Sequence, residues 1–268
     1  MSVLLTGKNL AGQLETALLV SVVDQEEAAA AACGGADIID IKNPAEGPLG
    51  APRPGVIAAI GKVLAQRPPV SVALGEFPGK PCAAALAAAG AAQFKPDFLK
   101  VAFTADTAGA MIIDTLREIQ QGIAAGGNKP IPLVAVAYAD TLPAARWSLA
   151  DFSAVVQAGG GAGCLVDTQA KNGVSLVNIL SPAELLVFID SCHGRGLFCG
   201  LAGSLRFSDI ALLRTLAPDI IGVRSAVCGG DRLRGRVTAD QVRRLKALFN
   251  VAATGGPADI LPVSGLLS

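Results

Sequence analysis

Short apolar runs rich in β-branched residues recur along the chain, and a stretch of helical character follows each of them. We expect strands at 18–23, 36–42, 69–76, 97–103, 131–138, 162–168, 197–202 and 219–225. We expect helices at 25–33, 54–66, 81–91, 107–125, 148–158, 182–194, 205–215 and 238–249. Strands that alternate with helices indicate parallel βαβ units. Eight such units predict an α/β fold with a closed (β/α)8 TIM barrel, because open doubly wound sheets more often have about five or six strands.

The length of 268 residues suits one barrel domain, and no linker or strong internal repeat divides the chain. We therefore predict a single domain at 1–268, with an N-terminal extension at 1–16 and a C-terminal tail at 251–268. Glycine and proline in the tail favour a position on the surface or on a neighbouring subunit. We interpret the arginines at 232, 234 and 236 as a solvated or inter-subunit loop, and expect a homo-oligomer.

Charge and apolar patterning exclude several kinds of partner. The 22 basic and 22 acidic residues balance, so no net charge draws the chain to nucleic acid or to an anionic membrane. The longest apolar run, 82–92, is too short to span a bilayer, and the N-terminus lacks the features of a secretory signal. Six cysteines without a CxxC pair are typical of reduced thiols. We expect a cytoplasmic enzyme. The only histidine, His193, ends a predicted helix, which argues against a zinc site or a Ser-His-Asp triad.

Two lysines lie in strands that are otherwise apolar. Because side chains alternate along a strand, Asp40 and Lys42 share a face with Ile38, while Lys100 shares one with Phe98. Burying an ammonium without a partner is costly. Such a lysine either pairs with a carboxylate or acts as an amine whose pKa is lowered.

Other polar residues end later strands, where barrel enzymes place their active sites. They include Asp167, Lys171 and, after the fifth strand, Tyr138 and Asp140. Amines and carboxylates that meet in one cavity suit imine chemistry, in which a lysine attacks a carbonyl and neighbours move protons. The alternative is that Asp40–Lys42 and Lys100–Asp167 are ion pairs that only fill the barrel mouth.

Glycine-rich loops follow the seventh and eighth strands, at 199–204 and 222–235. Barrel enzymes often bind phosphate there through backbone N–H groups. We expect Gly203, Ser204, Arg224 and Ser225 to bind a phosphate, with Arg224 as a bidentate clamp. Alternatively, the glycines only make tight turns. Amine and phosphate sites together predict a phosphorylated carbonyl substrate.

Several segments together resemble the (5-formylfuran-3-yl)methyl phosphate synthase family, also called 4-(hydroxymethyl)-2-furancarboxaldehyde-phosphate synthase. The matching segments run in order at 34–51, 97–101, 138–140, 165–171, 201–204 and 222–226. The resemblance implies a (β/α)8 lyase that condenses two molecules of the triose phosphate glyceraldehyde 3-phosphate, with loss of phosphate and water, early in methanofuran biosynthesis. It covers about 18–249 and excludes the terminal extensions.

The same resemblance implies roles for individual residues. Lys42 would form the Schiff base, Lys100 would accept a proton, and Asp40, Asp167 and Lys171 would take part in acid–base steps. No metal and no organic cofactor is implied. Two other functions stay open: a generic Schiff-base aldolase of phosphorylated sugars, and a non-catalytic barrel that serves as a binding or assembly subunit.

Overall fold

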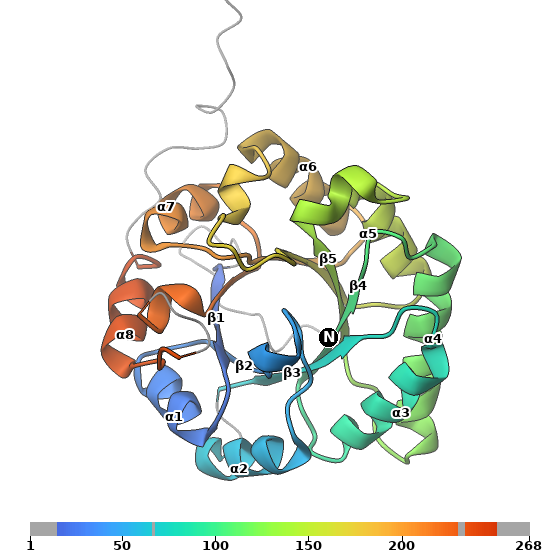
Figure 1. Ribbon diagram of the computed structural model, residues 1–268, viewed down its shortest axis with the longest axis horizontal. Coiled ribbons are helices and arrows are strands. Elements are labelled where there is room, and N and C mark those ends of the chain that lie inside the picture. Colours follow the sequence, from blue (N-terminus) through green and yellow to red (C-terminus); the bar gives the residue numbers. More distant parts are fainter. Residues whose placement is uncertain (1–14, 66–67, 230–233, 251–268) are drawn as a thin grey trace, which may run out of the picture.

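A computed structural model describes residues 15–65, 68–229 and 234–250 of the chain. Within this part, eight parallel strands form a closed barrel in chain order, and helices surround it (Figure 1). The strands are β1 Ala17–Val22, β2 Ile38–Ile41, β3 Val70–Glu76, β4 Phe98–Phe103, β5 Leu133–Tyr138, β6 Gly163–Asp167, β7 Phe198–Leu201 and β8 Ile220–Val223. The helices are α1 Gln25–Cys33, α2 Pro54–Leu64, α3 Pro81–Ala92, α4 Gly109–Ala125, α5 Leu149–Ala158, α6 Pro182–His193, α7 Phe207–Thr215 and α8 Ala239–Ala247. The predicted TIM barrel is confirmed.

Some helices and strands end at other residues than predicted, because the local backbone geometry stops them. Helix α2 stops at Leu64 because Ala65 adopts a left-handed conformation with φ of 46°. Strand β8 stops before Arg224, whose backbone leaves the extended region. Short 3₁₀ helices that we did not predict follow four of the strands within the described residues, at Pro44–Glu46, Ala139–Ala144, Leu176–Asn178 and Ser225–Val227. The N-terminal extension up to residue 14, the tail at 251–268 and Arg232 lie outside the described residues.

Side-chain caps start several helices. Ser181 caps α6 through a reciprocal bond with Glu184, and Pro182 occupies the first helical position. Asp24 caps α1 by accepting from the backbone N–H groups of Glu26 and Glu27 at 3.1 and 3.0 Å. These caps fix the points at which the chain turns from a strand into the next helix.

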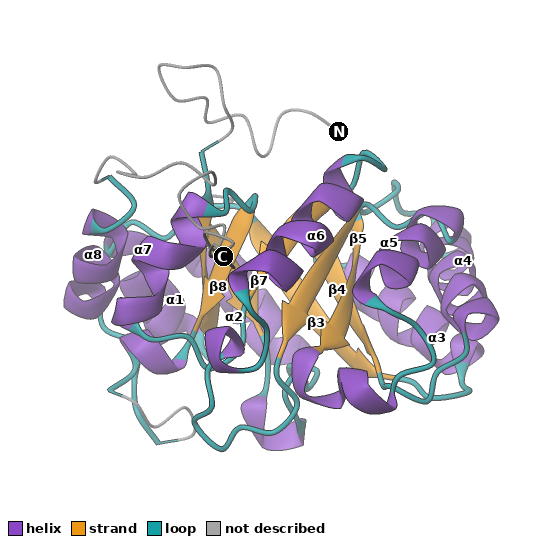
Figure 2. Ribbon diagram, turned by 90° about the horizontal axis from the view of Figure 1, so that it is seen from above, coloured by secondary structure: helices purple, strands orange, loops and turns teal. Residues whose placement is uncertain are grey.

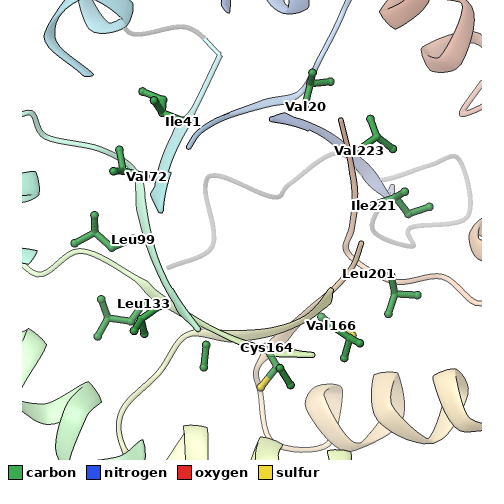
Figure 3. Packing of buried hydrophobic residues seen from close by; sticks show 14 of the residues in the cluster. Val20, Ile41, Val72, Leu99, Leu133, Cys164, Val166, Leu201, Ile221 and Val223 are labelled. Atoms are coloured by element: carbon green, nitrogen blue, oxygen red, sulfur yellow. The ribbon is translucent and has the colours of Figure 1, made fainter. Parts of the chain in front are cut away.

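Residues on the outer faces of the strands form the main hydrophobic core. Val20, Ile41, Val72 and Leu99 point away from the barrel axis and pack beneath the helices (Figure 3). All four are essentially inaccessible to water, and burying each such side chain contributes about 1.5–3 kcal/mol to folding. This outer layer therefore supplies most of the apolar burial that stabilises the barrel.

The inner faces of the strands change character from one end of the barrel to the other. Near the amino ends, Leu19, Ile38 and Ile220 form a small apolar cluster. Phe98 packs nearby against the edge of Phe198, with ring centroids 5.7 Å apart. Polar side chains occupy the inner positions nearer the carboxyl ends. The side view in Figure 2 shows the strands leaning past one another, so that these ends gather at one mouth. None of the described helices has the length and apolarity needed to cross a membrane.

Candidate active site

A pocket of about 480 Å³, including its open mouth, lies at the carboxyl ends of the strands. Lys42, Lys100, Asp167 and Lys171 all line it. They come from β4, β6 and the segments just after β2 and β6. The barrel thus brings together the lysines and the carboxylate that we singled out in the sequence.

Asp40 is the centre of a buried hydrogen-bond network beneath this pocket. Its carboxylate accepts from Lys100 Nζ at 2.7 Å, from Ser71 Oγ at 2.6 Å and from Ser21 Oγ at 2.8 Å. Asp40 is fully inaccessible, and burial alone would raise its pKa. The charges of Lys100 and Lys42 nevertheless hold the pKa of Asp40 below its ordinary value. The carboxylate is therefore ionised and fixed at neutral pH.

A second pair lies at the end of β6. Lys171 Nζ donates to Asp167 at 2.6 Å and to Thr168 Oγ1 at 3.2 Å. Burial opposes ionisation of Asp167, but Lys171 and Lys42 together lower its pKa to about 2. The alternative pairing of Asp40 with Lys42 and of Lys100 with Asp167 is wrong, because each carboxylate instead binds a different lysine.

Lys42 is left without a carboxylate partner. Its side chain is buried, with 7% of the residue exposed, and no carboxylate oxygen of the described residues lies within 4.0 Å of its ammonium. Burial lowers the pKa of Lys42 to about 7, although Asp167 and Asp40 act in the opposite direction. A substantial fraction of the amine is therefore unprotonated at neutral pH, the state that attacks a carbonyl carbon.

The loops after β7 and β8 form another part of the wall of this pocket. Gly203, Ser204 and Ser225 line the pocket, and neither serine hydroxyl has a hydrogen-bond partner among the described residues. Gly203 has φ of +115°, and a Cβ there would lie 2.9 Å from the Thr168 methyl, so the position requires glycine. Ser204 also has a positive φ, of 48°, a conformation that is strained for serine and typical of functional sites.

Arg224 borders the same pocket, but its guanidinium is held by a carboxylate. It donates to Glu27 at 2.7 and 3.4 Å and to the carbonyl oxygen of Ser21 at 3.0 Å. Glu27 also accepts from the backbone N–H groups of Val23 and Val237, at 3.1 and 3.3 Å. Arg224 therefore ties β8 to β1 and α1, and its predicted role as a phosphate clamp stays a prediction.

Some polar residues that shape the site escaped the sequence analysis. Ser21 and Ser71 hold Asp40, and the signal for them was a lone hydroxyl at an inward position of an apolar strand. Glu76 accepts a short hydrogen bond from Tyr138 inside the barrel. Burial, followed by this bond, raises the pKa of the Tyr138 phenol, which stays protonated.

Two residues considered in the sequence analysis lie away from the chemistry. Asp140 accepts from the N–H groups of Gln169 and Ala170, both at 2.7 Å, and so holds the loop that carries Lys171. His193 ends α6 as predicted and bonds Asp219 at 2.9 Å.

Comparison with known sequences identifies relatives across most of the chain. Residues 18–246 match a family model described as 4-HFC-P synthase. The (5-formylfuran-3-yl)methyl phosphate synthase of Methanosarcina mazei is 42% identical over 215 residues, covering 80% of this chain and 92% of the relative. The protein of the same name from Methanocaldococcus jannaschii is 39% identical over 235 residues, covering 86% and 98%.

Comparison with solved structures recovers the barrel alone. Phosphoribosyl anthranilate isomerase from Thermus thermophilus aligns with a TM-score of 0.58 at 14% identity, covering 88% of this chain and 98% of the isomerase. KGPDC from Streptococcus mutans aligns with a TM-score of 0.59 at 11% identity, covering 88% and 98%.

Proposed function

We propose that this chain, which belongs to the 4-HFC-P synthase family, condenses two molecules of glyceraldehyde 3-phosphate into (5-formylfuran-3-yl)methyl phosphate. Two relatives that bear the name of this synthase align with this chain over most of their own length. The observation that carries the proposal is the buried, unpaired Lys42 amine, which lines one pocket with the Lys100 amine and the Asp167–Lys171 pair. Such an amine is suited to form an imine with an aldehyde or ketone.

The atoms of the reaction balance without an oxidant or a reductant. Two three-carbon aldehydes supply the six carbons of the product, and one phosphate and two water molecules leave. One triose condenses with Lys42, releasing water as the iminium forms, and loss of its C2 proton gives an enamine that expels the C3 phosphate. The C3 carbon of the resulting enol attacks the ketone carbon of the second triose, which has isomerised to dihydroxyacetone phosphate, and this bond makes the branched carbon that carries the phosphomethyl group. Ring closure through the free hydroxyl of the second triose and two dehydrations then give the furan, and water releases the lysine.

The flanking ion pairs would move the protons that these steps require. Lys100 is held by Asp40 and Lys171 by Asp167, and both lysines line the same pocket as Lys42. We assign Lys100 as proton acceptor, and Asp40, Asp167 and Lys171 to acid–base steps. Gly203, Ser204 and Ser225 would hold a phosphate through backbone N–H groups and hydroxyls.

The wider setting of the reaction is part of the same proposal. Loss of phosphate would make the enzyme a carbon–oxygen lyase acting on phosphates. We propose that it works in the cytoplasm as a homo-oligomer, without a nucleic-acid or membrane partner, in the biosynthesis of methanofuran or an analogue. Because the iminium itself accepts electrons from the breaking C–H bond, the proposed route needs neither a metal nor an organic cofactor.

One assay tests the activity directly. Purified protein incubated with glyceraldehyde 3-phosphate alone should give a strongly UV-absorbing product, and inorganic phosphate in equal amount. Reversible cleavage of a sugar phosphate without furan formation would instead indicate a generic Schiff-base aldolase. A protein that leaves triose phosphates unchanged, yet binds another protein, would indicate an assembly subunit.

A trapping experiment tests the nucleophile. Borohydride added with substrate should increase the mass of the peptide that contains Lys42. Lys42→Ala should abolish both trapping and turnover, whereas Lys62→Ala, which removes an exposed lysine of α2, should change neither. If another lysine is labelled, or if Lys42→Ala is fully active, Lys42 is not the residue that forms the imine.

A further inference from the structure

A second depression, which we call the outer cleft, adjoins the catalytic pocket. The two share Lys171, Ser204 and Ser225 in their linings, so they lie side by side. Arg206 and Phe207 line only the outer cleft. A molecule in the outer cleft would therefore lie beside a molecule that is attached to the catalytic lysine.

The charge of the outer cleft differs from that of the catalytic pocket. Asp167 lines the catalytic pocket, but no carboxylate belongs to the described residues that line the outer cleft. Its charged side chains are those of Lys171 and Arg206. Helix α7, nine residues long, begins in the same wall at Phe207, so its positive end adds to this field. The lining is complementary to an anion.

Arg206 is exposed but anchored by bonds between two loops. Its guanidinium donates to the carbonyl oxygen of Gly173 at 2.9 Å, across the cleft wall. Its backbone N–H donates to Asp209 at 2.8 Å, and Asp209 also accepts from Ser175 Oγ at 2.6 Å. These bonds join the loop after β6 to the loop after β7. They hold the arginine at the rim before any ligand arrives, which reduces the cost of ordering it on binding.

A condensation of two phosphorylated trioses must place two phosphate groups near one lysine. In the cradle of Gly203, Ser204 and Ser225, the glycine lines only the catalytic pocket, and the two serines lie at its border with the outer cleft. We assign this cradle to the triose bound to Lys42. A second phosphate requires a separate anion site within reach, because two dianions repel each other strongly at short range.

We propose that the outer cleft binds the phosphate of the second triose phosphate, with Arg206 as its principal cation. The inference rests on the proposed function, since only a two-substrate condensation needs this site. The cleft would hold the ketone carbon of the second triose, dihydroxyacetone phosphate, beside the nucleophilic enol carbon of the triose on Lys42. The electron pair of that enol carbon forms the new C–C bond, and the ketone oxygen takes a proton from a neighbouring ammonium. Lys171, which lines both spaces, is placed to donate that proton.

The test separates capture of the first triose from capture of the second. In Arg206→Ala, borohydride trapping of glyceraldehyde 3-phosphate at Lys42 should be unchanged. At a fixed concentration of glyceraldehyde 3-phosphate, the concentration of dihydroxyacetone phosphate that gives half the maximal rate of furan formation should rise about tenfold or more, because a charge-assisted contact is lost. Arg206→Lys keeps the charge and should recover part of the loss. Arg117→Ala is the matched control: this exposed α4 arginine also bonds one carbonyl oxygen, at 3.2 Å.

Two results would overturn the assignment of the outer cleft. The first is furan formation by Arg206→Ala with unchanged half-saturation, which would leave the proposed function intact. The second is an equal loss of trapping and of condensation, which would place Arg206 with the first triose or with the fold in general. A wild-type protein that forms no furan would instead refute the function itself. Coincident urea unfolding curves for Arg206→Ala and wild type exclude misfolding as the cause.

Discussion

Replacing Lys42 by methionine should stabilise the protein while it abolishes catalysis. Methionine has a similar length and an unbranched, apolar side chain, so it can occupy the same space without a charge. In the folded protein the pKa of Lys42 is about 7, against an ordinary value of 10.5. This difference corresponds to about 5 kcal/mol by which the fold disfavours the protonated amine.

Proton linkage gives the direction in which the stability of the protein changes with pH. Because the pKa of Lys42 is lower in the folded state, unfolded chains bind more protons between about pH 7 and pH 10.5, so stability rises with pH there. The penalty is fully present below pH 7, at about 5 kcal/mol, and decreases to about 2 kcal/mol at pH 9. The neighbouring carboxylates do not contribute to this window, since Asp40 and Asp167 have pKa values below 3.8.

Urea unfolding of wild type and Lys42→Met at pH 6, 7.5 and 9 measures the effect. Far-UV circular dichroism and the fluorescence of Trp147, the only tryptophan, report on the same transition. The free energy of unfolding of the variant minus that of wild type should decrease by about 3 kcal/mol between pH 6 and pH 9. Any cost of repacking that does not depend on pH leaves this change unaffected. Lys62→Met, on the exposed face of α2, should show no such trend. A difference that stays constant with pH would refute a depressed pKa at Lys42.

Other substitutions test the packing and the ion pairs around the barrel. Glu27→Ala should lower the free energy of unfolding, measured with urea, by about 3–5 kcal/mol, because it removes the carboxylate that binds the buried guanidinium of Arg224. Replacement of the half-exposed Arg236 by alanine should lower it by about 1 kcal/mol or less. Equal losses in the two variants would contradict the difference expected between a buried and an exposed ion pair. Gly163→Ala should lower the melting temperature through about 1–3 kcal/mol of overpacking, since its Cβ would lie 2.4 Å from a phenylalanine ring on β7; unchanged melting would show that the ring moves freely. A hydrogen bond to a carboxylate raises the pKa of His193, so its contribution is complete below about pH 6.5 and is lost as pH rises through the raised value. The gap in melting temperature between wild type and His193→Gln should therefore close on going from pH 6 to alkaline pH.

The sequence alone predicts the barrel and the faces of its strands. Strict alternation put Asp40 and Lys100 on the faces of their strands opposite to Ile39 and Leu99. In the structure the first two side chains meet inside the barrel, and the other two pack in the outer core. This works because the side-chain period of a strand is fixed by backbone geometry and needs no knowledge of the neighbours.

The choice of ionic partners could not be predicted in the same way. Asp40 pairs in the register with Ser71, and Lys100 with Ala73, yet the two charged side chains meet across the barrel interior. In a closed barrel the tilt and stagger of the strands decide which inward residues share a level. A sequence pattern specifies the face of a residue but not that level.

The sequence also does not predict which charged residues that are far apart in the chain bind each other. Arg224 and Glu27 are 197 residues apart in the chain, and nothing in the alanine-rich segment around Glu27 distinguishes a buried carboxylate from a solvated one. Closure of the barrel between β1 and β8 brings them together. We predicted that Arg224 binds the substrate phosphate because the sequence does not indicate that Glu27 binds its guanidinium.

Adjacent residues of β4 have different roles, because alternate side chains point to opposite faces of the strand. Lys100 faces the reaction space, while Leu99 and Val101 on either side of it face the helices and bear the packing. A change of catalytic group at position 100 therefore leaves the apolar shell beneath α3 and α4 untouched. A barrel built in this way can acquire a different reaction one inward residue at a time, without first losing the framework that keeps it folded.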